Sequence, residues 1–85
     1  MEYIIVAFRS RSDTVRFAEF LKNKSVPAEI VNTPKEAGVG CGLSVKFSAR
    51  YLSAVKRAVV ISKPASYAGF FNVKTIGGRK FVKSI

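Results

Sequence analysis

The residue best suited to chemistry in this chain is its single cysteine, Cys41. Glycines stand on both sides of it, Gly40 and Gly42, and a third glycine, Gly38, lies close before them. Glycine permits backbone conformations with positive φ and leaves room for another molecule to approach. A strand-like apolar run, LSVKF, follows directly. The pattern predicts a thiol presented by a pliable loop at the start of a strand.

A presented thiol can act as a nucleophile toward sulfur, because the thiolate attacks a donor's sulfur atom. A free thiol has a pKa of about 8.5, so such a site needs nearby cations that favour the anion. Lys35 and Lys46 are close in sequence and are the predicted thiolate-supporting residues. A lone cysteine is often a buried apolar filler. The flanking glycines favour a functional thiol at Cys41 over that structural interpretation.

The remaining side chains include few of the residue types that enzymes use for catalysis. The chain has no histidine, which removes the commonest general base and metal ligand. Its five acidic residues are scattered and form no paired-carboxylate motif. Zinc-knuckle and phosphate-loop patterns are absent from the sequence. We therefore predict a carrier or binding protein and not an enzyme, with no metal and no cofactor.

Length and composition indicate one basic domain over residues 1–85. Fifteen Lys and Arg against five Asp and Glu give a formal charge of +10, which favours anionic partners without naming one. No segment approaches the roughly 20 consecutive apolar residues of a membrane span, and the first residues do not resemble a secretory signal. A lone cysteine fits a reducing compartment. We expect a cytoplasmic protein without a membrane partner.

Hydrophobic periodicity predicts strands and helices that would position the cysteine. The predicted elements are a central strand over residues 2–9, a helix over 13–24, strands over 28–32 and 43–47, a second helix between Ser48 and Lys63, and strands over 67–76 and 79–85. Ser12 is the predicted cap of the first helix. Gly77 and Gly78 predict a two-residue hairpin turn. The order predicts an α+β fold, a ferredoxin-like βαββαβ sandwich with an extra C-terminal hairpin strand, both helices on one face and the other face open.

The chain resembles the sulfur or selenium (Se/S) carrier-like protein family, first described only as a domain of unknown function. The resemblance rests on the succession of TP at 33–34, CGLSVKFS at 41–48, a helix, and YAGFFNV at 67–73. The resemblance extends over about residues 3–73, and CGL before VKF is its most specific part. It implies that Cys41 takes up sulfur or selenium as a persulfide or selenosulfide, with Gly42 as its required neighbour. It also implies a desulfurase-like protein donor and a protein acceptor. The glycine-rich segment before Cys41 and the strand after Gly77 depart from the family pattern.

Single-stranded nucleic-acid binding is the alternative, because a basic sheet with exposed aromatic side chains can stack bases. The aromatic candidates are Tyr67, Phe70, Phe71 and Phe81. The candidate phosphate-binding residues are Lys74, Arg79, Lys80 and Lys83. SYAGFFNV matches the RNA-binding RNP1 pattern only in part, so Phe71 and Val73 are expected in the core. Cations on an edge hairpin also serve to block strand pairing, and a protein-interaction module is a third interpretation that leaves the oligomeric state open.

Overall fold

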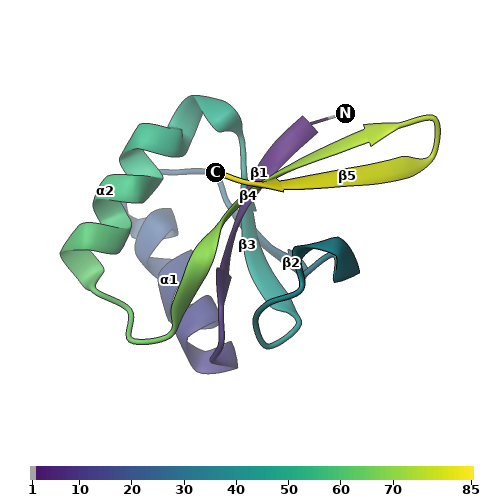
Figure 1. Ribbon diagram of the computed structural model, residues 1–85. Helices are drawn as coiled ribbons and strands as arrows, with labels where there is room; N and C mark the ends of the chain where they lie inside the picture. Colours follow the sequence, from purple (N-terminus) through teal and green to yellow (C-terminus); the bar gives the residue numbers. More distant parts are fainter. Residues whose placement is uncertain (1) are drawn as a thin grey trace.

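The computed structural model describes residues 2–85 (Figure 1). In chain order the elements of these residues are β1 (Glu2–Phe8), α1 (Arg11–Asn23), β2 (Glu29–Asn32), the 3-10 helix η1 (Lys35–Ala37), β3 (Leu43–Phe47), the 3-10 helix η2 (Ala49–Tyr51), α2 (Leu52–Ser62), β4 (Tyr67–Ile76) and β5 (Arg79–Ser84). The predicted α+β class is confirmed. Neither helix of residues 2–85 combines the length and apolar character needed to cross a membrane.

The strands form one antiparallel sheet in the order β2-β3-β1-β4-β5. β1 lies at its centre, between β3 and β4. The continuous apolar run of β1 explains this position, because Ile4 to Phe8 are all at most 3% exposed and are covered on both faces. β5 is added beyond β4, so the predicted C-terminal hairpin strand is confirmed. The five-strand order differs from that of a simple βαββαβ unit.

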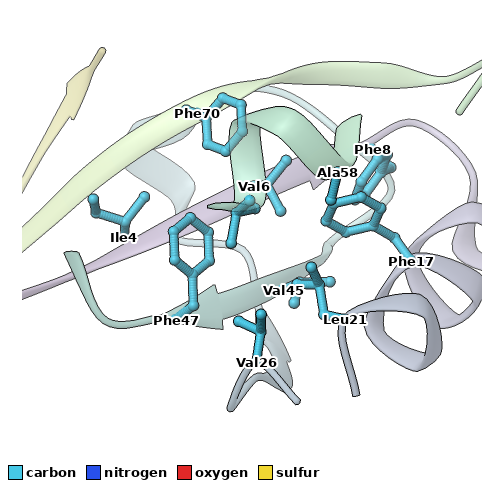
Figure 2. Packing of buried hydrophobic residues seen from close by; sticks show 11 residues of the cluster. Ile4, Val6, Phe8, Phe17, Leu21, Val26, Val45, Phe47, Ala58 and Phe70 are labelled. Carbon is cyan, nitrogen blue, oxygen red and sulfur yellow. The ribbon is translucent and has the colours of Figure 1, made fainter. Parts of the chain in front are cut away.

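Both helices pack on one face of the sheet and form the main core with it (Figures 1 and 2). Phe17 and Leu21 come from α1, and Val55 and Ala58 come from α2. The ring of Phe17 lies 5.2 Å from that of Phe8 on β1, centroid to centroid. Aromatic and aliphatic burial of this kind supplies most of a small domain's stability. The core therefore fixes α1 against the end of β1, close to the cysteine.

α1 begins at Arg11 because Ser10 caps it. The Ser10 Oγ accepts a hydrogen bond from the Asp13 N–H at 3.3 Å, which satisfies one of the free amides of the first turn. The prediction of Ser12 as the cap was wrong by two residues. The Ser12 Oγ instead lies 2.9 Å from the Ser10 Oγ. Asp13 lies in the first turn of the helix, as predicted. The helix start is thus pinned by a short network of hydroxyl groups.

The second face of the sheet is covered in part, and the prediction of an open face was wrong. A second buried cluster on this face consists of Ile5, Ala7, Phe71 and Val73. Ala37 and Val39, from the segment between β2 and β3, pack against this cluster. The glycine-rich segment therefore folds back over the sheet, because its two apolar side chains are removed from water there. The burial of Phe71 and Val73 confirms their prediction as core residues.

The β4–β5 hairpin turns at Gly77 and Gly78, with φ of 56° and 80°. Ile76 pairs with Arg79, so these two glycines form the whole connection. Positive φ at both positions is the geometry of a two-residue hairpin turn that matches the twist of the strands. The predicted turn is confirmed. Figure 1 shows the tip of this hairpin reaching away from both helices.

Candidate functional site

The cysteine lies in a closed loop, residues 33–42, which we call the cysteine loop. The loop is closed at its base because the Thr33 N–H donates to the Gly42 carbonyl oxygen at 2.8 Å. The hydroxyl groups of Thr33 and Ser44 lie 2.6 Å apart and reinforce this closure beside β3. Ser44 is fully buried, and this contact satisfies its polar group. The loop is thus a compact excursion between β2 and β3 with its two ends held together.

The backbone of the cysteine is bonded to the central strand. The Cys41 N–H donates to the Phe8 carbonyl oxygen at 3.0 Å. Gly40 has φ of +92°, and a Cβ atom at this position would lie 2.9 Å from the same oxygen. Only glycine fits both the positive φ and this close approach. Glycine at position 40 is therefore required by the packing of the loop against β1, and room for another molecule beside Cys41 stays a prediction.

The Cys41 side chain is half-buried beside the first turn of α1. Its Sγ lies 3.8 Å from the Thr14 Oγ1 and 3.9 Å from the Leu43 carbonyl oxygen. Thr14 is fully buried, and its hydroxyl donates to the Ser10 carbonyl oxygen at 3.0 Å. The sulfur therefore has polar neighbours at the start of a helix. Because the Thr14 hydroxyl proton is directed to Ser10, both oxygen atoms near the sulfur are placed to accept a hydrogen bond from the thiol.

A basic depression of about 570 Å³ adjoins the cysteine loop. Its lining residues are Arg9, Thr33, Pro34, Lys35, Gly38, Val39, Gly40 and Gly42. Two of them, Gly40 and Gly42, flank Cys41 in the chain. Lys35, a predicted support of the thiolate, thus lies at the loop that carries the cysteine. Arg9 lines the same depression, although its distance in sequence gave no sign of this. The surface next to the cysteine therefore carries two cations.

Lys46 occupies a different part of the molecule. Its Nζ lies 3.4 Å from the Glu29 carboxylate and 4.6 Å from the centre of the Tyr3 ring. It lies near the end of β3, three strand residues beyond Leu43, and each strand residue adds about 3.3 Å. The structure therefore does not bring Lys46 together with the cysteine. Its ammonium group is already occupied by a carboxylate and an aromatic ring.

The basic residues of the hairpin divide between the two faces of its ribbon. Pairing of Lys74 with Phe81 and of Asn72 with Lys83, together with strand alternation, places Lys74, Arg79, Phe81 and Lys83 on the face that the helices cover elsewhere. Lys80 pairs with Thr75 and lies on the opposite face. Of the other predicted aromatic residues, Phe70 and Phe71 are buried and Tyr67 is 39% exposed. Only some of the residues predicted to bind nucleic acid therefore lie on one surface.

Asp13 and Ser66 form a contact that sequence reasoning missed. The Asp13 carboxylate accepts hydrogen bonds from the Ser66 Oγ at 2.6 Å and from its N–H at 3.0 Å. The hydroxyl hydrogen bond is the main cause that holds the pKa of Asp13 below its ordinary value, and the backbone hydrogen bond and Arg16 act in the same direction. The Ser66 carbonyl oxygen also accepts a hydrogen bond from the Arg9 N–H at 2.8 Å. Ser66 thus holds the β1–α1 connection that borders the cysteine.

Comparison with known proteins identifies a family. A family model described as "Putative Se/S carrier protein-like" matches residues 2–71. The matched segment includes the cysteine loop, both helices and the first five residues of β4. No curated protein and no solved structure matches the chain. Most of the chain is covered by the match, and the resemblance seen in the sequence is confirmed: the chain belongs to the Se/S carrier protein-like family.

Proposed function

We propose that this protein carries sulfur or selenium on Cys41, as a persulfide or a selenosulfide. The observation that carries the proposal is the setting of the sulfur, half-buried among polar groups and bonded through its backbone to the central strand. Membership of the Se/S carrier protein-like family supports the same function. Protein donors and acceptors in general follow from a carrier role, and a desulfurase-like enzyme is the donor that we propose.

The loading step needs only a thiolate and a donor persulfide. The Cys41 sulfur attacks the outer sulfur of the donor's persulfide, and a new S–S bond forms at Cys41 while the donor's S–S bond breaks. The donor cysteine leaves as a thiolate, so no external oxidant or reductant enters the step. Delivery is the reverse exchange onto an acceptor. Cys41 holds the persulfide after loading and returns to its free thiol after delivery, so the protein acts as a carrier and not as a catalyst of turnover.

The basic depression has a role in this scheme. A donor persulfide is anionic, and the cations of Arg9 and Lys35 lie beside the loop that receives it. Charges placed near a reacting anion favour its approach and its bound state. We assign Lys35 and Arg9 to this role. Lys46 is not assigned to it, because Glu29 and Tyr3 occupy its ammonium group.

We also infer that the family domain is a ferredoxin-like sandwich to which β5 has been added. The partial order β2-β3-β1-β4 and the placement of both helices on one face support this inference. The arrangement leaves the cysteine loop at the end of the sheet where β1 terminates. We further propose that the protein works in the cytoplasm, where reducing conditions keep an unpaired thiol free.

The test is intact-mass analysis after incubation with a cysteine desulfurase and cysteine. We expect an adduct of about 32 Da for one added sulfur, which disappears in Cys41→Ser and on reduction. The matched pair Lys35→Gln and Lys46→Gln removes one charge in each case. Lys35→Gln should load several-fold more slowly, and Lys46→Gln should load at the wild-type rate. A Cys41 thiol that reacts with iodoacetamide but never gains sulfur would contradict the proposal.

A further inference from the structure

The β4–β5 hairpin presents cations and an aromatic ring together on one face. Lys74 on β4 stands directly opposite Phe81 on β5, and Ile76 stands opposite Arg79. Lys83 lies two residues from Phe81 and therefore points to the same face. We call the surface of these five residues the hairpin face. A row along β5 thus reads cation, ring, cation, with about 7 Å between neighbours.

The hairpin face is open to solvent. Phe81 is 49% exposed and Ile76 is 56% exposed, and the three cations are exposed as well. The two helices cover this side of the sheet elsewhere, but the hairpin extends past them (Figure 1). The Arg79 guanidinium lies 5.7 Å from the centre of the Phe81 ring, which is a cation–π distance. Ring and charge therefore form one continuous surface.

Protection of a sheet edge does not account for this surface. Charged side chains on an edge strand prevent it from pairing with other chains, and Lys80 on the opposite face of β5 serves that purpose. Lys74 belongs to β4, however, which is paired on both sides and has no free edge. Phe81 is an exposed apolar ring on the edge strand itself, which is the opposite of protection. The hairpin face needs another explanation.

The charge of the hairpin points to an anionic partner. Residues 72–85 contain four Lys and Arg and no Asp or Glu. The neighbouring acid, Glu2, is engaged by the Asn72 Nδ2, which donates to its carboxylate at 2.8 Å. The whole of this segment lies beyond residue 71, where the family match ends. The surface is therefore an addition to the family domain, with a charge of its own.

We propose that the hairpin face binds single-stranded nucleic acid. A base stacks on Phe81, and the phosphates on either side of it contact Arg79, Lys83 and Lys74. Stacking on an exposed ring between cations is the usual way in which proteins bind single strands without sequence preference. A duplex keeps its base faces stacked inside, and an acidic protein would give the ring no comparable partner. The exposed ring thus favours a single strand over both.

The hairpin face is separate from the cysteine. Lys74 pairs with Glu2 at the start of β1, whereas the Cys41 N–H bonds to Phe8 at its end. Six strand residues separate these points, which is about 20 Å. Binding at the hairpin face therefore does not depend on the proposed carrier function. Cys41→Ser should bind nucleic acid as the wild type does.

Fluorescence anisotropy with a labelled 20-nucleotide single strand of RNA or DNA, over a series of salt concentrations, tests the proposal. Phe81→Ala should weaken binding by about tenfold and leave the salt dependence unchanged, because it removes stacking only. Arg79→Gln, Lys74→Gln and Lys83→Gln should each lower the slope of log K against log salt by about 0.7. Lys80→Gln is the matched control on the opposite face and should retain more affinity than Arg79→Gln. Circular dichroism melting confirms that each variant is folded.

Three competitors separate the single strand from other anions: the matching duplex, polyglutamate and vesicles with phosphatidylserine. Tighter binding to the single strand than to each competitor supports the proposal. Equal or tighter binding to any one of them would overturn it and assign the surface to that partner class. Absence of binding at low salt, or equal losses for Lys80→Gln and Arg79→Gln, would also overturn it.

Discussion

The cysteine loop and the β4–β5 hairpin both contain glycines with positive φ, but one of the loop glycines, Gly40, is also required by a neighbouring strand. A Cβ atom at Gly40 would meet the Phe8 carbonyl oxygen at 2.9 Å, whereas a Cβ atom at Gly78 would have no neighbour within 4 Å. The loop is therefore shaped by the central strand against which it lies. The hairpin is shaped by its own two-residue turn. One region depends on the whole fold, and the other depends on local geometry.

The sharpest test of this comparison is to place alanine at each type of glycine. Gly40→Ala should lower the free energy of unfolding by about 3 kcal/mol, because it adds both backbone strain and a close contact with Phe8. Gly42→Ala has the same sign of φ, +95°, but open space around the new Cβ atom. It should cost about 1 kcal/mol, from strain alone. Urea denaturation measures both values.

The Gly40 variant should also change the cysteine itself. Displacement of the loop breaks the hydrogen bond from the Cys41 N–H to Phe8, so alkylation of Cys41 in the native state should change its rate. Gly78→Ala, at the hairpin turn, is the control and should leave that rate unchanged. Equal unfolding free energies for Gly40→Ala and Gly42→Ala would show that the close contact relaxes without cost.

The next effect is a pH dependence that belongs to the cysteine side of the molecule. The pKa of Asp13 is lowered in the folded state, chiefly by the Ser66 hydroxyl. The stabilisation that results is present above the unfolded-state pKa of Asp, about 3.9, and is lost as the pH falls through the lower folded value. The stability advantage of the wild type over Ser66→Ala should therefore be largest near neutral pH and shrink in acid.

Urea denaturation of both proteins at several pH values between about 2 and 7 measures this difference. Asp13→Asn is the matched control, because it keeps the size of the side chain and removes its titration. An advantage over Ser66→Ala that stayed constant across this range would show that the hydrogen bond does not depend on the charge of Asp13.

The smallest expected effect concerns stability on the hairpin side. Phe81→Ala and Arg79→Gln change exposed side chains, so each should alter the free energy of unfolding by no more than about 0.5 kcal/mol. The same variants should still lose nucleic-acid affinity. Thermal melting with each purified variant measures the effect. A loss of several degrees for Phe81→Ala would assign the ring to the core of the hairpin and remove the distinction between the two regions.

The same contrast explains what the sequence could predict. The continuous apolar run of β1 and the Gly77-Gly78 turn are local signals, and both predictions are confirmed. The helix cap was assigned to Ser12 instead of Ser10, because both serines precede the apolar positions of α1 and either could act as a cap. The covering of the second face depends on Ala37 and Val39 meeting a distant cluster. No local pattern distinguishes such residues from ordinary loop residues.

Prediction of the site was limited in the same way, to residues that are close together in the sequence. Cys41, Gly40 and Lys35 were found because they are neighbours in sequence, and their chemical roles stay predictions. Lys46 was added for the same reason, but an extended strand carries it away from the thiol. Arg9 reaches the same depression from another part of the chain, and Ser66 reaches the start of α1 by a hydrogen bond. Contacts of this kind require the three-dimensional arrangement.

The hydrogen bond between the Cys41 N–H and Phe8 has a consequence for any exchange of sulfur. It ties the backbone of the cysteine to the central strand of the sheet, so the reach of the sulfur is set by rotation of its own short side chain. The movement that brings the two sulfur atoms together must therefore come from the other protein. Donors and acceptors should therefore carry their own reactive cysteine on a protruding or flexible segment that enters beside the fixed sulfur. A partner whose cysteine lies at the bottom of a deep, rigid cleft would be unable to exchange sulfur with Cys41.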